Sequence, residues 1–346
     1  MPAIYFRTDG NEDIATGHIM RCLSIARACA VRRAKVCFLV ADETSVSALR
    51  ERFVRPDEFT VHCLHSDYKE PESELPALRS IVSESSCIFL DSYFVTKKYL
   101  QELQKLYKVA YLDDLLAFDY PADLIVNYDI LERPACYRHA ETVLIGASYT
   151  PLREQFSAAS YEVHPQVQNI LLSTGGTDSY DIAGQLLAMI FAGTDNRLQS
   201  YHYHVVTSRF NRHLEKLQDF SHLHPTIHIH ENIQDMAAFM CGCDLAISAG
   251  GTTLYELCAV GVPSVSFSTA DNQLHAVETM SHEQIVPYAG DVRSTGRNAL
   301  NAMLSFLCEY GSSYEKRKKS SQKMRAFVDG EGAARISEAL LQYVKR

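Results

Sequence analysis

The chain has 346 residues, more than one hydrophobic core usually serves, so two domains are expected. It is 47% hydrophobic and 22% charged, as globular proteins are. A net charge of −9 argues against a nucleic-acid groove or an anionic membrane surface, so we expect a small-molecule partner. The start lacks a signal-peptide core and no apolar run approaches transmembrane length, so we expect a cytoplasmic chain without stable membrane insertion.

In the first part of the chain, short apolar or β-branched runs alternate with longer helical patterns. This alternation is typical of parallel sheets with crossover helices. The expected strands cover residues 3–7, 35–40, 60–63, 87–90, 109–112, 124–126 and 143–145. The expected helices cover residues 18–31, 45–52, 74–83 and 96–106. We interpret residues 1–160 as a first α/β domain.

After Arg153 the chain becomes polar and irregular, and the alternation restarts at Ile170. Further strands are expected at residues 169–172, 203–206, 226–230, 245–248 and 264–267. Further helices are expected at residues 181–191, 233–241, 253–259 and 274–280. We interpret residues 161–325 as a second α/β domain, and residues 326–346 as a C-terminal helix that packs back on the first domain.

Three glycine turns lie near the ends of expected strands. Gly17 opens the first helix, Gly175-Gly176-Thr177 follows one apolar run, and Gly250-Gly251-Thr252-Thr253 follows another. Glycines let backbone N–H groups approach phosphates, and the next helix adds its positive dipole end. Ligands of open α/β sheets bind beyond the carboxyl ends of the strands, so these turns predict a nucleotide diphosphate site. A tight turn without a ligand is the alternative for each turn taken alone.

Taken together, the motifs resemble a known family. Residues 231–238, 243–256, 261–263 and 270–273 resemble the donor-binding lobe of GT-B proteins such as the GlcNAc transferase that makes lipid II. Residues 6–9, 16–23, 113–114, 146–153 and 175–178 resemble the UDP-2,4-diacetamido-2,4,6-trideoxy-beta-L-altropyranose hydrolases of the pseudaminic acid pathway, whose relatives include spore-coat polysaccharide synthesis proteins. The resemblance implies an α/β fold of the GT-B type, with two Rossmann-like domains facing each other across a cleft.

The resemblance also implies metal-independent hydrolysis of a UDP-sugar at its anomeric carbon, with inversion and without a cofactor. His18 matches the residue that activates water. Tyr93 matches a tyrosine near the sugar, and we expect it to be a catalytic residue as well. A histidine at a helix N-terminus is disfavoured as imidazolium, which leaves a lone pair available. Helix capping, or a hydrogen bond to the other lobe, is the alternative for His18. Ser92 stands where the better-known hydrolases usually have histidine, which leaves the exact sugar open.

Arg7 and Asp9 end the first expected strand, so we expect them to bind the sugar or to fix His18, with Asp9 as a catalytic residue. Arg21 is a further expected substrate contact. A surface ion pair with Arg21 is the alternative for Arg7 and Asp9, and such a pair contributes little free energy. We interpret Asp113-Asp114 as a turn or helix cap rather than a metal site.

The resemblance places the remaining contacts in the second domain. The backbone around Ile233 is expected to meet the uracil, and Glu256 the ribose. Asn272 and Gln273 are expected in a loop that reads the sugar substituents, with a plain polar surface loop as the alternative. Further substrate contacts are expected from Gly17, Gly175, Gly176 and Thr177, and contacts to the diphosphate from Gly251, Thr252 and Thr253.

No metal site is expected. His202, His204, His228 and His230 alternate along expected strands, and we interpret them as solvated or structural faces because different strands give no reason for convergence. Cys241 and Cys243 are too close together, without a partner pair, for a zinc site. The ten cysteines mostly lie singly in apolar segments, as reduced core thiols do.

Two functions remain open. The first is a hydrolase that releases UDP and a free sugar for nonulosonic acid or surface polysaccharide biosynthesis. The second is a GT-B glycosyltransferase that uses a UDP-sugar donor in surface polysaccharide assembly. The first-domain motifs favour hydrolysis. A non-catalytic sugar-nucleotide sensor would keep the diphosphate turns but would not require His18.

Overall fold

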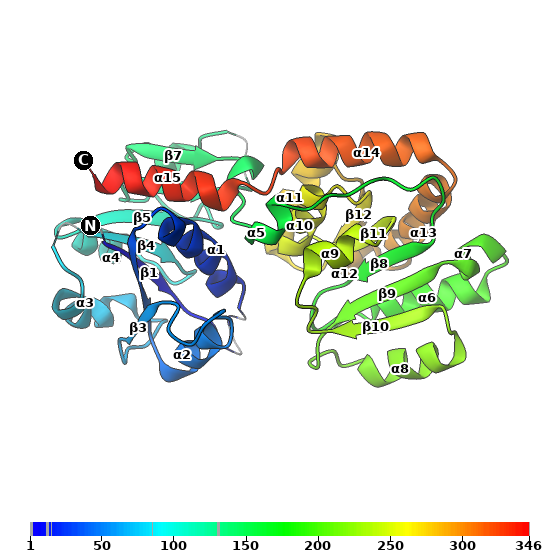
Figure 1. The fold of residues 1–346 in the computed structure, drawn as a ribbon, viewed down its shortest axis with the longest axis horizontal. Coiled ribbons are helices and arrows are strands. Elements are labelled where there is room, and N and C mark those ends of the chain that lie inside the picture. The colour runs from blue at the N-terminus through cyan, green and yellow to red at the C-terminus, as the bar shows by residue number, and fades with distance from the viewer. Residues whose placement is uncertain (1–2, 12–13, 15, 85, 130–131, 346) are drawn as a thin grey trace. The chain divides into compact units, whose positions relative to one another are not determined.

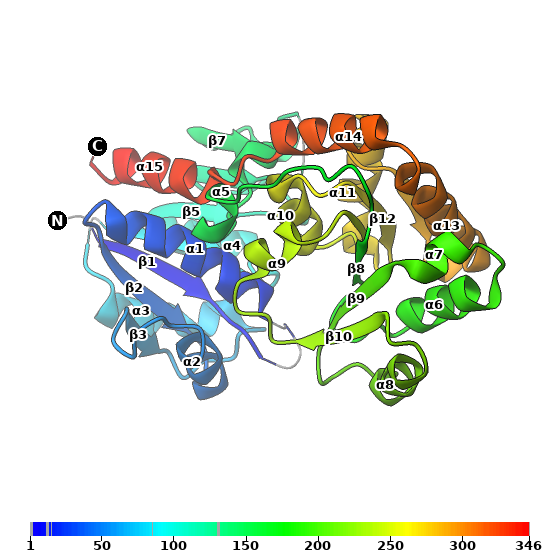
Figure 2. The same ribbon diagram turned by 45° about the vertical axis from the view of Figure 1, so that its right-hand side comes forward.

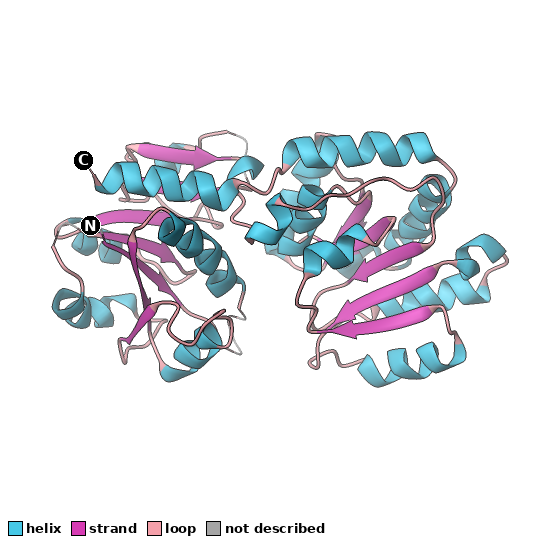
Figure 3. Cartoon of the chain, viewed as in Figure 1, coloured by secondary structure: helices cyan, strands magenta, loops and turns pink. Residues whose placement is uncertain are grey.

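The computed structural model describes residues 3–11, 14, 16–84, 86–129 and 132–345. Its contacts divide the chain into two compact units. Unit 1 comprises Met1–Glu154 with Gly330–Arg346, and unit 2 comprises Gln155–Asp329. Each unit contains one parallel β-sheet with helices on its faces (Figures 1 and 3).

The sheet of unit 1 has seven strands in the order β3-β2-β1-β4-β5-β6-β7. Its strands are β1 (Ala3–Thr8), β2 (Lys35–Val40), β3 (Thr60–Cys63), β4 (Cys87–Asp91), β5 (Lys108–Leu112), β6 (Leu124–Asn127) and β7 (Thr142–Ile145). The central strands are almost wholly buried because helices cover both faces of the sheet, which explains their continuous apolar sequences. The strand order reverses between β1 and β4.

The helices of unit 1 begin at recognisable capping residues in two cases. Asp42 accepts from the N–H of Ser45 at the start of α2, and Thr96 accepts from the N–H of Tyr99 at the start of α4. The helices are α1 (Gly17–Val31), α2 (Glu43–Arg50), α3 (Leu75–Ile81), α4 (Lys97–Gln104) and α15 (Gly332–Val344), with short 3-10 turns η1 (Pro71–Glu74), η2 (Ala135–Tyr137) and η3 (Ala147–Tyr149).

Helix α15 completes unit 1 by packing along α1 (Figures 1 and 2). Ile336 and Leu340 are fully buried on its inner face. A Cβ at Gly332 would lie 2.2 Å from the carbonyl oxygen of Thr150, so the helix starts where only glycine allows such an approach. Nζ of Lys108 donates to the carbonyl of Tyr343 at 2.8 Å and fixes the other end.

The sheet of unit 2 has six strands in the order β10-β9-β8-β11-β12-β13. Its strands are β8 (Asn169–Ser173), β9 (His202–Thr207), β10 (Ile227–Glu231), β11 (Leu245–Ala249), β12 (Ser264–Ser268) and β13 (Tyr288–Asp291). Its helices are α6 (Ile182–Ala192), α7 (Asn196–Ser200), α8 (Leu214–Leu223), α9 (Met236–Cys241), α10 (Thr252–Val260), α11 (Asp271–His282), α12 (Val292–Thr295), α13 (Arg297–Gly311) and α14 (Tyr314–Phe327), and α5 (Glu154–Ser157) crosses the boundary between the units. The strand order reverses between β8 and β11.

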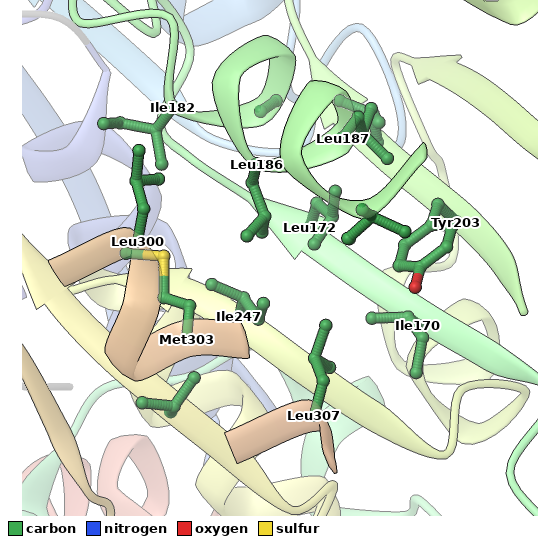
Figure 4. Close-up of a cluster of buried hydrophobic side chains, with 14 of the residues drawn as sticks. Ile170, Leu172, Ile182, Leu186, Leu187, Tyr203, Ile247, Leu300, Met303 and Leu307 are labelled. Carbon is green, nitrogen blue, oxygen red and sulfur yellow. The ribbon is translucent and has the colours of Figure 1, made fainter. Parts of the chain in front are cut away.

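One core of unit 2 lies between this sheet and helices α6 and α13 (Figure 4). Leu186 of α6 and Met303 of α13 pack in one cluster with Leu172 of β8 and Ile247 of β11. Each side chain removed from water in this way contributes about 1.5–3 kcal/mol. The cluster therefore anchors β8 and β11, the two strands at which the order reverses.

The structure has the parallel α/β sheets expected from the sequence, and it adds elements that the pattern did not predict. These are strand β13 and helices α5, α7, α8, α12, α13 and α14. In the described part of the chain, no helix combines the length and the apolar character needed to cross a bilayer.

Candidate functional site

The reversal of strand order in unit 1 brings His18 and Asp91 together. Ligands of doubly wound sheets bind beyond the carboxyl ends of the strands at such a reversal. His18 lies in the first turn of α1, the helix that follows β1, and Asp91 is the last residue of β4. Nδ1 of His18 lies 2.5 Å from Oδ1 of Asp91, and both side chains are buried.

The carboxylate of Asp91 determines which ring nitrogen of His18 carries the proton. Burial alone would raise the pKa of Asp91, but the charge of Arg21 and the contact with His18 outweigh it and hold this pKa well below its usual range. An ionised carboxylate only accepts hydrogen bonds, so Nδ1 of His18 is the donor. The neutral ring then has its lone pair on Nε2, the arrangement of a general base.

Arg21 lies one turn after His18 on α1 and binds the same carboxylate. Its Nε and Nη2 each donate to Asp91 at 2.6 Å. Nη2 also donates to Asp114 at 2.7 Å, and Nη1 donates to the hydroxyl of Tyr128 at 2.8 Å. Arg21 thus holds Asp91 in position for His18. Sequence reasoning placed Asp91 directly after an expected strand, at its cleft-facing end, and Asp114 in a turn. It predicted no contact of Arg21 with Asp91, Asp114 or Tyr128, because these contacts span between 70 and 107 residues.

Tyr93 lies beside the imidazole of His18. The two ring centroids are 4.4 Å apart and the planes are at 80°, an edge-to-face contact. Tyr93 is 40% exposed, so it covers one side of His18 at the surface of unit 1. The structure therefore clusters His18, Arg21 and Tyr93 among the predicted site residues, and Gly17 precedes them as the first residue of α1.

Arg7 and Asp9 form a second buried network around the end of β1. Nε of Arg7 donates to both carboxylate oxygens of Glu74, at 2.9 and 2.8 Å, and Nη1 pairs with Asp9. The hydroxyl of Tyr99 donates to Glu74. Oδ1 of Asp9 accepts from the N–H of Ala41 at 2.7 Å. The network fixes the end of β1 and Asp9, which follows it.

The alternative of a surface ion pair between these residues and Arg21 is wrong. Arg7 and Asp9 are 3% and 2% exposed, and among the described residues their ionic partners are each other and Glu74. Arg21 instead pairs with the carboxylates of Asp91 and Asp114.

The two neighbouring aspartates after β5 have different roles. Oδ1 of Asp113 accepts from the N–H of Leu115 at 2.9 Å and from the hydroxyl of Tyr120 at 2.8 Å, so Asp113 stabilises a turn as expected. Asp114 differs from that expectation, because its carboxylate pairs with Arg21.

In unit 2 two predicted glycine turns lie at the reversal of strand order. Gly175, Gly176 and Thr177 follow β8, and Gly251 immediately precedes Thr252 and Thr253, the first residues of α10. The N–H groups of the first helical turn have no acceptor within the helix and carry its positive dipole end. A Cβ at Gly175 or Gly251 would meet no atom within 4 Å, so a ligand can approach the backbone at both turns.

Gly250 has a packing role. A Cβ there would lie 2.3 Å from Cγ1 of Val277, so the missing side chain lets α11 approach the turn. Oε1 of Gln273 accepts from the N–H of Thr269 at 2.8 Å, which fixes the start of α11. Asn272 and Gln273 lie in the first turn of α11, not in the loop expected from the sequence.

The predicted uracil and ribose contacts lie at the same edge of the sheet. Ile233 follows β10. In the sheet, β9 lies between β10 and β8. Asp235 caps α9 by accepting from the N–H of Ala238 at 2.9 Å. Glu256 is half-buried, about one turn into α10. Parallel strands place all these segments beyond their carboxyl ends.

Four histidines of unit 2 form a stacked column on β9 and β10. In the order His202, His228, His204, His230, successive ring centroids lie 5.2, 5.0 and 5.2 Å apart. Nδ1 of His202 lies 2.9 Å from Nε2 of His228, and Nδ1 of His204 lies 3.0 Å from Nε2 of His230. These side chains come together because β9 and β10 are adjacent strands, a pairing that the sequence pattern alone did not indicate.

Acidification is expected to destabilise the chain through this column. Burial, followed by the neighbouring imidazoles, lowers the pKa of His204 to about 4, and the pKa values of His228 and His230 are also lowered. Histidine in the unfolded chain has a pKa near ~6.5. Between about pH 6.5 and 4 the unfolded chain therefore binds more protons than the folded chain, and the free energy of unfolding decreases as the pH is lowered. After allowing for solvent screening, we expect His204 to account for a loss on the order of 1–2 kcal/mol.

Urea unfolding at neutral pH and near pH ~5 measures this loss. A His204→Asn variant is expected to lose less stability than the wild type over this range. His222→Asn, which changes an exposed histidine on α8, is the matched control and should behave as the wild type. The same pH dependence in His204→Asn and in the wild type would contradict the role of the column.

No model of a known protein family matches the chain. The chain is 28% identical over 202 residues to the spore coat polysaccharide biosynthesis protein SpsG of Bacillus subtilis, a match that covers 57% of each protein. It is 24% identical over 244 residues to the UDP-2,4-diacetamido-2,4,6-trideoxy-beta-L-altropyranose hydrolase of Campylobacter jejuni, covering 66% of this chain and 79% of that protein. The chain thus spans little more than half the length of SpsG.

Solved structures establish the fold. MurG of Acinetobacter baumannii superposes with a TM-score of 0.71 over 99% of this chain and 100% of that chain, at 12% identity. UDP-GlcNAc 2-epimerase of Neisseria meningitidis, bound to UDP-GlcNAc, gives a TM-score of 0.60 over 99% and 100% of the two chains, at 13% identity. The prediction of an α/β fold of the GT-B type is confirmed.

Proposed function

We propose that this chain hydrolyses a UDP-linked acetamido-deoxy sugar at the bond between the anomeric carbon and the UDP oxygen. The products are UDP and the free sugar with inverted anomeric configuration. The free sugar then enters nonulosonic acid or surface polysaccharide biosynthesis. The sequence similarity to the Campylobacter hydrolase and to SpsG supports this class of substrate.

The observation that carries the proposal is the buried His18–Asp91 pair at the reversal of strand order in unit 1. With Nδ1–H donated to Asp91, Nε2 of His18 takes a proton from water as the water oxygen bonds to the anomeric carbon. The carbon–oxygen bond to UDP breaks, and its electron pair leaves on the UDP oxygen. The Asp91 carboxylate stabilises the imidazolium that forms, and Arg21 keeps Asp91 ionised.

Unit 2 binds the UDP group in this proposal. The helix N-terminus at Thr252 and Thr253, together with the turn at Gly175, Gly176 and Thr177, supplies N–H donors for the diphosphate. Gly251, whose own N–H donates to the carbonyl of Ala249, lets the diphosphate approach the backbone there. Charge on the leaving oxygen grows as the bond breaks, so these donors stabilise the transition state more than the ground state. Ile233 contacts the uracil through its backbone, and Glu256 binds the ribose hydroxyls.

Other predicted residues have supporting roles in the proposal. Tyr93, at the exposed side of His18, contacts the sugar. Arg7 and Asp9 act as positioning residues for the loop between β1 and α1, since Asp9 is bound to Arg7 and Ala41. Asn272 and Gln273 contact the sugar substituents from the first turn of α11, and Gly17 lets substrate approach the start of α1.

The test is incubation of the full chain with a panel of UDP-linked acetamido sugars, including the diacetamido-trideoxy altrose, in ¹⁸O-labelled water. No acceptor is added, and parallel samples contain EDTA. We expect UDP release with or without EDTA, the label on the sugar and not on UDP, and an inverted anomeric signal by NMR. Label on UDP would show cleavage at phosphorus and contradict the proposal.

The same assay separates the alternative function. A GT-B glycosyltransferase would bind UDP and the UDP-sugar, but without an acceptor it would form little UDP from the UDP-sugar. Tight UDP binding without turnover of any panel member would therefore favour the transferase.

A further inference from the structure

Glu43, Cys63 and His65 form a cluster of side chains in unit 1 that the proposed reaction does not use. Cys63 ends β3, His65 follows it by two residues, and Glu43 is the first residue of α2. One ligand atom from each side chain lies within 4.8 Å of the other two. Sγ of Cys63 lies 3.5 Å from Nδ1 of His65.

The backbone holds these side chains together. On either side of His65, the N–H of Leu64 donates to the carbonyl of Val40 and the N–H of Ser66 donates to the carbonyl of Ala41, at 2.8 and 3.0 Å. His65 itself has a φ of 50°, in the left-handed region that costs a residue with a side chain free energy. This conformation persists because the two flanking hydrogen bonds enforce it, and it keeps the imidazole near Cys63.

The distances fit a zinc ion. Zinc binds thiolate at about 2.3 Å and imidazole at about 2.0–2.1 Å with tetrahedral angles, which places the sulfur and nitrogen about 3.5 Å apart. The 3.5 Å between Cys63 and His65 already matches this separation. Glu43 is exposed at the start of its helix, so a rotation of its side chain can bring a carboxylate oxygen to a third corner.

The chemistry of the three ligands also selects the metal. Thiolate is a soft ligand that favours zinc over magnesium or calcium, and imidazole suits zinc equally well. The carboxylate of Glu43 adds a negative charge beside the thiol and the imidazole, which favours a divalent cation at this cluster.

We propose that Glu43, Cys63 and His65 form a zinc-binding site with three protein ligands and a fourth position for water. The site joins the exit of β3 to the start of α2. The turn between β2 and α2 also holds the residues that follow β1. The N–H of Ala41 donates to Asp9, and the hydroxyl of Ser45 in α2 accepts from the N–H of Gly10. A bound ion therefore stabilises the turns that hold Asp9 and Gly10. The proposal does not depend on the proposed hydrolysis.

Cobalt substitution tests this site directly. The full chain, reduced and freed of metal, is titrated with Co²⁺ and followed by absorption. We expect one equivalent to produce a thiolate-to-cobalt charge-transfer band with intense visible bands of tetrahedral cobalt, and Zn²⁺ to displace both. The histidine column on β9 and β10 contains no thiol, so binding there would not give the charge-transfer band.

Variants assign the ligands. Cys63→Ser is expected to abolish the charge-transfer band, and His65→Ala and Glu43→Gln to weaken cobalt binding by about tenfold or more. Cys136→Ser is the matched control, because Cys136 is a half-buried free cysteine of unit 1 outside the cluster, and it should bind cobalt as the wild type does. Glu43→Gln changes an exposed residue, so it tests the site even if Cys63→Ser does not fold.

A charge-transfer band that is absent from the wild type, or undiminished in Cys63→Ser, would overturn the proposal. In that case the contact between Cys63 and His65 is a thiol–imidazole hydrogen bond. A metal-dependent increase in melting temperature that Glu43→Gln reduces would support the role of the site in unit 1.

Discussion

Replacing His18 with asparagine is expected to lower the turnover number for UDP-sugar hydrolysis by about 10²–10⁴-fold. The asparagine side chain keeps an N–H donor for Asp91 in place of Nδ1, but it has no lone pair equivalent to Nε2. It therefore removes the proton acceptor while preserving the contact that positions it. Turnover is measured as UDP release, and the dissociation constant of UDP by calorimetry.

UDP binding is expected to stay unchanged in His18→Asn, because the proposed UDP contacts belong to unit 2. The matched control is His139→Asn, which alters an exposed histidine of unit 1 beside Asp119 and should leave turnover unaffected. If His18→Asn kept its turnover within about threefold of the wild type, His18 would not be the base. A loss of UDP binding instead of turnover would assign His18 to substrate binding.

Asp91→Asn is expected to lower both activity and stability. The carboxylate is fully buried, and it accepts from His18 and from two nitrogens of Arg21. Neutralising it removes one of the two carboxylates that pair with Arg21, while Asp114 remains. Breaking a buried pair costs up to about 3–5 kcal/mol, so we expect a loss of stability below that limit. The amide can also donate to Nδ1 of His18, which moves the ring proton to Nε2 and removes the base. Turnover is therefore expected to fall by about 10²–10⁴-fold.

Urea unfolding and UDP release separate these two effects of Asp91→Asn. Turnover is compared at a temperature where circular dichroism shows the variant folded, so that lost activity is not lost protein. Asp119→Asn is the control, since this carboxylate pairs with Arg138 near the surface and its loss should barely move the unfolding midpoint. Wild-type stability in Asp91→Asn would mean that Arg21 does not depend on Asp91 for its charge balance.

The fold could be predicted where the chain is buried on both faces. The β4 and β11 segments are continuous apolar runs, and their predicted bounds agree with the structure to within one residue. Strand β13 was not predicted, because Tyr288-Ala289-Gly290-Asp291 lies half-buried at an edge and contains no apolar run. Helix α14 was not predicted because its sequence is dominated by lysine, arginine and serine rather than by an apolar stripe.

Local sequence motifs predicted only part of the candidate site. The motif Gly17-His18 at the start of a helix identifies His18, but its partner Asp91 lies 73 residues further along the chain. Their contact follows from the strand order, since β4 pairs with β1, the strand that leads toward His18. Sequence reasoning placed Asp91 at a strand end, and the strand order would have paired it with His18, because β4 lies beside β1. Glu74 lies in a 3-10 turn, and no sequence signal marked it as the partner of Arg7.

Helix α15 belongs to unit 1 but is synthesised after the whole of unit 2. The ribosome adds about 5–20 residues per second, so on the order of ten seconds or more separates the synthesis of the two parts of unit 1. During that interval α1, the helix that carries His18, lacks the apolar partner that α15 provides. Unit 2 is continuous and can fold first. A released chain truncated before Gly332 would therefore have a complete unit 2 and an exposed apolar surface on unit 1, the kind of surface that chaperones bind.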